Sequence, residues 1–200
     1  MKLKKFEGNP ILSPTDANDW ESLVTCNPGV IYDDGTFYML YRAAGNDAEH
    51  VIRLGLATSK DGFHFERVSD MPAFGPSEDG PDSGCVEDPR IVKYDTEYYI
   101  TYAYRPYSPG QYWNFGHDEI LLPECGSDAP MALRKNLGNT GLAVTTDFRE
   151  FKRLGRLTSP VLDDRDVILF PEKVQGKYVM LHRPKEYIGG EYGVDYPSIW

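Results

Sequence analysis

The sequence predicts an all-β protein whose strands form a series of four-stranded sheets, the pattern of a β-propeller. Two observations carry this prediction. Among the 200 residues, 14 are Tyr, 19 are Gly and 15 are Pro, a composition typical of aromatic strands joined by tight turns. One residue pattern also recurs three times along the chain, and a hydrophobic share of 40% suffices for a folded core. We therefore expect a single domain over residues 1–200.

The recurring pattern reads as a β-hairpin, with a short strand, a tight polar turn and a longer aromatic strand. Alignment of the copies at their prolines makes Asn27, Asp88 and Phe170 equivalent, since each of these residues precedes a proline. The three copies cover residues 27–42, 88–105 and 170–183.

A second pattern follows the first two hairpins, at residues 53–66 and 139–152. There, small and apolar residues precede a polar turn and an aromatic pair, which predicts a third and a fourth strand. Propellers close with about four to eight blades. We therefore expect the chain to cover roughly the first three blades of a longer enzyme and to be unable to turn over substrate alone. The blade-like repeats are expected near residues 27–68, 88–155 and 170–200.

Two long connections, near residues 69–87 and 106–138, interrupt the repeats. Structureless connections beyond about 12–15 residues are uncommon in compact domains and often carry function. Two interpretations of the second connection stand side by side: a lid over an active site, and a solvated or oligomer-forming insertion.

Charge and cysteine content exclude several classes of protein. The 21 basic and 31 acidic residues leave a formal net charge of −10, which disfavours nucleic acid as a partner. Three cysteines without a CxxC spacing indicate neither a disulfide framework nor a zinc site, and the four histidines show no metal-ligand spacing. Neither an export signal nor a membrane-spanning apolar run is visible, so we expect a cytoplasmic protein that does not bind membranes.

The repeat itself predicts where a site should lie. In a propeller the first strand of each blade lines the central channel, so equivalent residues of successive blades converge on one axis. Polar and charged residues at such positions are hard to explain as ordinary solvent-exposed side chains. The residues that this alignment brings to the channel are Asn27, Arg42, Glu87, Asp88, Arg90, Tyr104, Arg105, Glu172, Lys173, His182 and Arg183.

Within this set, the segment Glu87-Asp88-Pro89-Arg90 is the most specific local motif. Proline has a fixed φ and biases the preceding residue towards an extended conformation, which would aim Asp88 rigidly. The alternative interpretation is a turn-forming Asp-Pro pair with a structural ion pair to Arg90.

An ordered set of motifs resembles glycoside hydrolase family 130, whose members are five-bladed β-propellers that act on β-mannosides. The resemblance extends over essentially the whole chain, and it implies five blades here. The motifs that carry it are Asn9-Pro-Ile-Leu-Ser13, Asn27-Pro28, Tyr41-Arg-Ala43, Glu87-Asp-Pro-Arg90, Phe170-Pro-Glu-Lys173 and His182-Arg-Pro184.

The resemblance implies that Asp88 is the general acid, which protonates the glycosidic oxygen through a hydroxyl of the mannosyl unit. It also implies that Arg42 and Arg53 bind mannose. The other residues that we expect to bind the substrate are Asn27, Glu87, Arg90, Tyr104 and Glu172.

Most members of this family are phosphorylases, which use inorganic phosphate to cleave the mannoside with inversion and release α-mannose 1-phosphate. The resemblance places Arg165 at the phosphate, assisted by Lys173, His182 or Arg183. The expected ligands are therefore a small oligosaccharide and inorganic phosphate, without a metal or another cofactor. The sequence does not distinguish a monomer from a homo-oligomer.

Two alternatives remain at this point. Asn139 aligns with Arg53, at a position where phosphorylases of this family are expected to carry an arginine, which leaves open an inverting β-mannosidase of the same fold. Such a hydrolase needs a second carboxylate about 6.5–9.5 Å from the acid, whereas phosphate needs only positive charge to position it. The second alternative is a non-catalytic carbohydrate-binding propeller.

Overall fold

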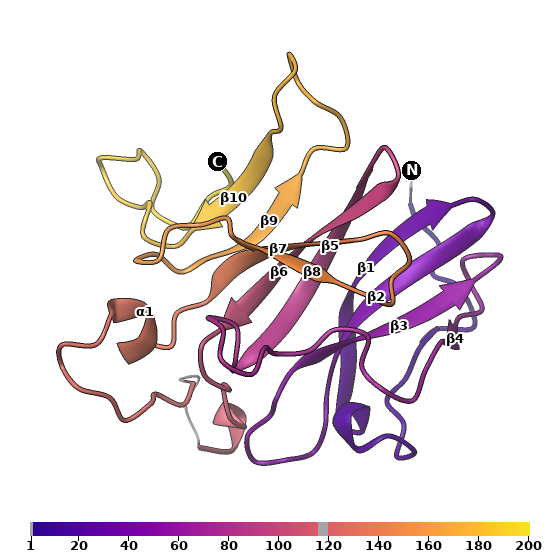
Figure 1. The fold of residues 1–200 in the computed structure, drawn as a ribbon, viewed down its shortest axis with the longest axis horizontal. Helices are drawn as coiled ribbons and strands as arrows, with labels where there is room; N and C mark the ends of the chain where they lie inside the picture. Colours follow the sequence, from indigo (N-terminus) through magenta and orange to yellow (C-terminus); the bar gives the residue numbers. More distant parts are fainter. Residues whose placement is uncertain (1, 116–119) are drawn as a thin grey trace.

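The computed structural model describes residues 2–115 and 120–200 and is built almost entirely of antiparallel strands (Figure 1). Two four-stranded sheets follow one another, each with its strands in chain order, and a two-stranded sheet comes last. The first sheet holds β1 (Val24–Asp33), β2 (Thr36–Ala44), β3 (Arg53–Ser59) and β4 (Glu66–Arg67). The second holds β5 (Cys85–Tyr94), β6 (Glu97–Arg105), β7 (Asn139–Thr145) and β8 (Lys152–Arg156). The third holds β9 (Asp164–Leu169) and β10 (Met180–Pro184).

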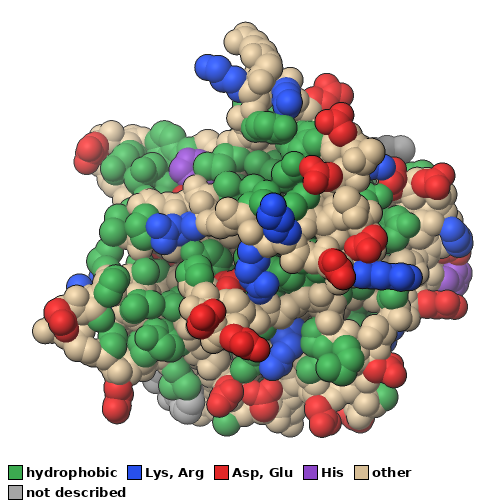
Figure 2. Space-filling model, viewed as in Figure 1, with side chains coloured by type: hydrophobic (Ala, Val, Ile, Leu, Met, Phe, Trp, Pro, Cys, Tyr) green, Lys and Arg blue, Asp and Glu red, His purple; other side chains and the backbone are tan. Residues whose placement is uncertain are grey.

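Helical structure among the described residues is limited to three short segments: η1 (Asp19–Glu21), η2 (Tyr112–Phe115) and α1 (Met131–Arg134). None of the helices found in residues 2–115 and 120–200 has the length and apolar character needed to cross a membrane. On the face shown in Figure 2, Lys and Arg side chains are interspersed with Asp and Glu. The prediction of an all-β protein is confirmed.

The first strands of the three sheets lie beside one another, because β1 contacts β5 and β5 contacts β9. The core fills the space between the first and second sheets. One buried cluster joins Leu54 and Phe74 to Val86, Tyr102 and Tyr104. The starts of β1, β5 and β9 lie close together, since Asn27 bonds Asp88 and Arg165 lies 3.8 Å from Glu87.

Each of these first strands carries a β-bulge at its start, where two residues face one residue of the partner strand. In β1 and β5 the two residues are Asn27-Pro28 and Asp88-Pro89. In β9 they are Asp166 and Val167. The first residue of each bulge has a positive φ: 44° for Asn27, 53° for Asp88 and 63° for Asp166. The extended conformation expected for Asp88 is therefore wrong, because the bulge places this residue in the left-handed region.

The third repeat therefore differs from the expectation. Its first strand spans Asp164–Leu169, ahead of the expected start at residue 170, and Phe170 lies in the connection to β10. Asp166, and not Phe170, is equivalent to Asp88. A left-handed backbone favours Asn and Asp, whereas the proline that follows them is tolerated but not required, and Val167 replaces it here.

A side-chain arrangement repeats along with the strands. The Tyr41 hydroxyl donates a hydrogen bond of 2.9 Å to buried Glu21, which also pairs with Arg67 Nε at 2.9 Å. We call this group a carboxylate clasp, because the carboxylate joins the second strand to the fourth. The second sheet repeats it with Asp82, Tyr102 and Arg153, at 3.0 Å to the hydroxyl and 2.7 Å to Nε.

Candidate active site

Asp88 lies at the bulge of β5, where the bulge of β1 and the end of β2 approach it. Its Oδ1 accepts hydrogen bonds from Asn27 Nδ2 at 2.9 Å and from Arg42 Nη1 at 3.1 Å. The Asp88 side chain is 15% exposed. The structure thus brings together three residues that the sequence assigned to the site, and the carboxylate is held on one oxygen.

Glu87, the neighbour of Asp88, is buried and faces three guanidinium groups. Arg42 Nη1 lies 2.7 Å from Glu87 Oε2, while Arg165 Nη1 and Arg105 Nε lie 3.8 Å and 3.9 Å from Oε1. These arginines come from β2, β9 and β6, so all three sheets meet at one carboxylate. Arg105 was expected at the channel, but without a role in binding or catalysis.

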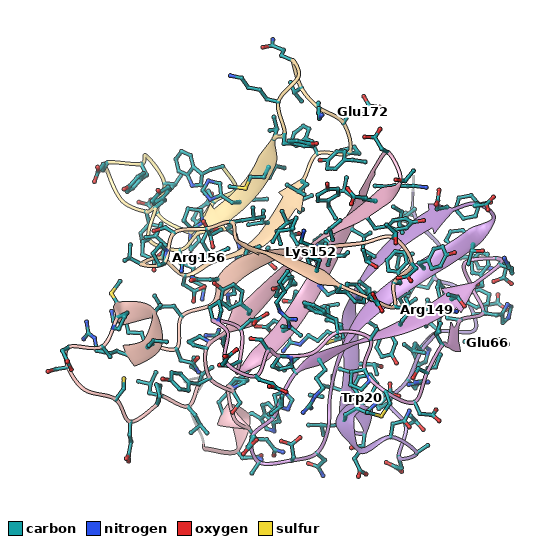
Figure 3. All side chains as sticks on the ribbon, viewed as in Figure 1. Trp20, Glu66, Arg149, Lys152, Arg156 and Glu172 are labelled. Atoms are coloured by element: carbon teal, nitrogen blue, oxygen red, sulfur yellow. The ribbon has the colours of Figure 1, made fainter. Side chains whose placement is uncertain are left out.

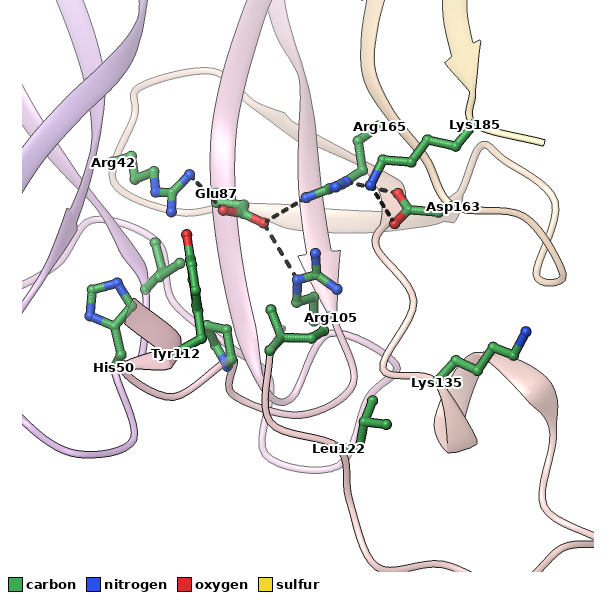
Figure 4. A pocket seen from close by; sticks show the side chains of 13 residues that line it. Arg42, His50, Glu87, Arg105, Tyr112, Leu122, Lys135, Asp163, Arg165 and Lys185 are labelled. Carbon is green, nitrogen blue, oxygen red and sulfur yellow. Dashed lines mark hydrogen bonds and ion pairs between the residues drawn. The ribbon is translucent and has the colours of Figure 1, made fainter. Parts of the chain in front are cut away.

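A pocket of about 610 Å³ opens beside Glu87 (Figure 4). Its lining carries five basic and two acidic side chains, in a chain with a formal net charge of −10. The basic residues are Arg42, Arg105, Lys135, Arg165 and Lys185, and the acidic ones are Glu87 and Asp163. Asp163 is itself paired with Arg165 Nε at 2.9 Å and with Lys185 Nζ at 3.0 Å.

Electrostatics distinguish the three arginines. Burial lowers the pKa of Arg105, and the neighbouring charge of Arg165 lowers it further, against the opposing effect of Glu87. Burial also disfavours the charged forms of Arg42 and Arg165, but nearby carboxylates outweigh it and raise both pKa values. Among the described residues Arg105 pairs only with Glu87, at 3.9 Å, so its charge is incompletely neutralised and this part of the pocket is suited to a small anion.

The opposite side of the pocket is aromatic and apolar. His50 and Tyr112 lie there (Figure 4), and Ile52, Pro109 and Leu122 also line the pocket. Three of these residues belong to the connection over 106–138, which therefore forms part of the pocket lining. No regular pattern in the sequence marks them, because their positions depend on how this loop folds back over the sheets.

A second charged cluster surrounds Asp166, the bulge residue of β9. Its carboxylate is paired with Arg183 Nη2 at 2.5 Å and lies 3.9 Å from Arg90 Nη2. Arg90 and Arg183 were expected near the site, whereas Asp166 was missed. Its signal was the acidic run Asp163-Asp164-Arg165-Asp166 directly before an apolar strand, which parallels Glu87-Asp88.

The structure places other expected site residues elsewhere. Arg53 donates to the Val51 carbonyl at 3.1 Å and lines a separate pocket with Trp20 and Asp47. Tyr104, expected to bind the substrate, is 3% exposed and packs in the core with Leu54, Phe74 and Val86. Its position follows from strand alternation, which turns it away from the channel.

Three further expected residues lie in or after the connection between β9 and β10. Glu172 and Lys173 are exposed on that loop, where Figure 3 shows Glu172 at the edge of the molecule. Lys173 Nζ lies 4.6 Å from the centre of the Tyr178 ring. His182 pairs through Nδ1 with buried Asp164 at 2.7 Å and is not among the residues that line the pocket. Within the described part of the chain, no group of three His, Cys, Asp or Glu side chains is placed to hold a metal ion.

Several known proteins are similar to this chain in sequence and in fold. A 1,2-beta-oligomannan phosphorylase from Thermoanaerobacter sp. (strain X514) is 34% identical over all of this chain and 56% of that protein. A beta-1,2-mannobiose phosphorylase from the same organism is 30% identical over 92% of this chain and 55% of the relative. The chain thus spans about half the length of these relatives.

Among solved structures, the beta-1,2-mannobiose phosphorylase from Listeria innocua superimposes with a TM-score of 0.64. It is 21% identical over 92% of this chain and 59% of that chain, a level that supports the fold alone. A family model described as beta-1,4-mannooligosaccharide phosphorylase matches residues 2–113. With this match and the 34% identity over its full length, the chain belongs to glycoside hydrolase family 130.

Proposed function

We propose that the complete protein is an enzyme that cleaves β-mannosides by inverting phosphorolysis and releases α-mannose 1-phosphate. The observation that carries this proposal is the excess of five basic over two acidic side chains in the pocket that Glu87, the neighbour of Asp88, helps to line. Phosphate is already a nucleophile and needs positive charge to hold it, for which rigid guanidinium groups are well suited. The Thermoanaerobacter relatives are phosphorylases by name, which supports the same reaction here.

In this proposal Asp88 supplies the proton. Both described contacts of its carboxylate go to Oδ1, which leaves Oδ2 to carry the proton towards a hydroxyl of the bound mannosyl unit. That hydroxyl passes its own proton to the glycosidic oxygen, and the bond between this oxygen and the anomeric carbon breaks. A phosphate oxygen forms the new bond on the opposite face, so the leaving sugar gains a hydroxyl and the configuration inverts.

Arg105, Arg165, Lys135 and Lys185 are the residues that we propose for the phosphate. Arg165 was expected in this role from the sequence, and the other three line the same pocket. A phosphate-binding role has less support for Lys173 and His182. Lys173 is exposed on a loop, and His182 is paired with the buried carboxylate of Asp164.

Hydrolysis is the second candidate, because Asp166 supplies another carboxylate at a bulge equivalent to that of Asp88. Its oxygens face Arg183 and Arg90, and these ion-pair contacts compete with a water molecule for the same carboxylate. The charges around Asp166 therefore favour phosphorolysis over hydrolysis.

The wider setting that we propose is a cytoplasmic five-bladed β-propeller that needs no metal or other cofactor. The successive sheets with adjoining first strands support the propeller. Cys26, Cys85 and Cys125 are free thiols, as is usual in a reducing compartment. Inside a cell, the charged sugar phosphate would also be retained.

The test uses the full-length protein with β-1,2-mannobiose or β-1,4-mannobiose, with and without inorganic phosphate. We expect cleavage that depends on phosphate, with α-mannose 1-phosphate as the product detected by phosphorus NMR. Equal release of free mannose without phosphate would establish a hydrolase instead. Saturable binding of both disaccharides without cleavage in either condition would establish a carbohydrate-binding module.

A further inference from the structure

The two sides of the pocket differ in chemistry. Figure 4 shows Lys135, Asp163 and Lys185 on one side and His50 and Tyr112 on the other, with the carboxylate of Glu87 between them. The first side also carries Arg165, whereas Arg42 lies on the side of His50 and Tyr112. The second side has no role in the reaction described so far.

The second side is a rigid aromatic surface. Trp113 packs edge-on against both neighbours, with ring centres 4.7 Å from His50 and 5.3 Å from Tyr112. The Gly110 amide donates to the Glu49 carbonyl at 3.0 Å, which ties this part of the loop to the first sheet. The rings are therefore fixed by packing and by the backbone.

His50 adds polar groups to this surface. Its side chain is 96% buried, since the residue is 4% exposed, and Nδ1 has no hydrogen-bond partner among the described residues. Burial lowers the pKa of His50, and the charge of Arg42 lowers it further, so the imidazole stays neutral at neutral pH. The Gly45 backbone also bonds the imidazole, so the unpartnered Nδ1 is the nitrogen that remains to pair with a sugar hydroxyl group.

The stereochemistry of the reaction assigns an occupant to this surface. In an inverting displacement the nucleophile and the leaving group lie on opposite faces of the anomeric carbon. The cations mark the side of the phosphate, so the leaving sugar must lie on the other side. We propose that His50 and Tyr112 form the subsite for the sugar that leaves, which is the acceptor sugar when the reaction runs in reverse. This inference rests on the proposed phosphorolysis.

The test measures the reverse reaction of the full-length protein, with α-mannose 1-phosphate as donor and mannose as acceptor. In Tyr112→Ala we expect the KM for mannose to rise about tenfold, as the loss of aromatic stacking implies. The KM for α-mannose 1-phosphate should stay unchanged. Tyr112→Phe keeps the ring and should restore the KM for mannose. Tyr107→Ala, an exposed tyrosine of the same loop that does not line the pocket, is the matched control.

A rise in the KM for α-mannose 1-phosphate alone, or no change in either KM, would overturn the subsite. If Tyr112→Ala lowers the melting temperature below that of the assay, His50→Gln is compared in the same way, with the same expected rise for mannose. Failure of the proposed function has a different signature, because the wild-type protein would then cleave mannobiose equally well without phosphate.

Discussion

Asp88 has a backbone conformation that few side chains tolerate, and its carboxylate accepts hydrogen bonds from two neighbouring side chains. Its φ of 53° lies in the left-handed region, where Asn and Asp are better tolerated than other residues with a side chain. Asn27 and Arg42 then hold one carboxylate oxygen from the adjoining sheet. The orientation of the acid is therefore set both by its own backbone and by its partners.

The substitution Asp88→Asn tests this residue directly. The amide keeps the size and the tolerated backbone conformation, but it has no proton to donate to the substrate. We expect kcat for mannobiose to fall about 10²- to 10⁴-fold, the usual contribution of a general acid. The melting temperature should stay close to that of the wild type, which shows that the loss is chemical. Near wild-type turnover in the variant would remove Asp88 from the mechanism.

At the scale of elements, the two carboxylate clasps fasten the fourth strand of each sheet. In the two four-stranded sheets the fourth strand is short or exposed. Such strands depend on side-chain contacts as much as on backbone hydrogen bonds to the neighbouring strand. Glycine is required beside each clasp. A Cβ at Gly55 would lie 2.1 Å from the Tyr41 ring, and one at Gly141 would lie 2.5 Å from the Tyr102 ring.

The clasp of the second sheet makes stability depend on pH. Burial alone would raise the pKa of Asp82, but hydrogen bonds from Ser77 and Arg153 outweigh it and lower the pKa below its usual value. A carboxyl whose pKa is depressed by folding stabilises the folded state above the pKa of the unfolded chain, about 3.9. This stabilisation is lost as the pH falls through the lower, folded value.

We therefore expect Asp82→Asn to lower the free energy of unfolding at neutral pH by about 1–3 kcal/mol, the cost of losing charged hydrogen bonds at a buried site. The difference between variant and wild type should shrink as the pH falls below about 4. Urea unfolding across this range measures both effects. Glu66→Gln, on the exposed side of β4, is the control and should change little. A constant difference at every pH would exclude titration of Asp82 as its source.

The sequence predicts elements whose signals are local and misses those that depend on long-range packing. The first two hairpins are predicted by a polar turn between a short strand and a longer aromatic strand, and the prolines after Asn27 and Asp88 align them correctly. The predicted position of the third hairpin is wrong because valine follows its bulge residue, Asp166. The alignment at prolines therefore selects Pro171, which lies after the strand. In the site, Glu87 and Asp88 share one short motif. Tyr112 lines the pocket from an irregular loop, and no periodic pattern of residues in the sequence predicts its position.

At the scale of the whole molecule, the pocket is assembled from all three sheets. Arg42 comes from the first sheet, Arg105 from the second and Arg165 from the third, and each faces Glu87. An anion bound among them would join the sheets and oppose their separation. Ligand binding and the cohesion of the sheets are therefore coupled.

This coupling predicts that inorganic phosphate stabilises the protein against heat. Phosphate at about 100 times its Kd adds about 2.7 kcal/mol of stability, which raises the melting temperature by about 5–10 °C. Arg165→Ala should abolish most of this increase, and sodium chloride at the same ionic strength is the control for screening. An equal increase in Arg165→Ala, or with chloride, would show that phosphate acts outside this pocket. Differential scanning calorimetry provides the measurement.

The bulges of β1, β5 and β9 also bear on how such an enzyme originates. Asn27, Asp88 and Asp166 occupy the same place in three successive copies of one structural unit, as expected after duplication of an ancestral gene. Asn and Asp codons differ by one base, and both side chains suit the left-handed backbone. A duplicated array of this kind offers several equivalent backbone positions at which an acidic side chain can be placed.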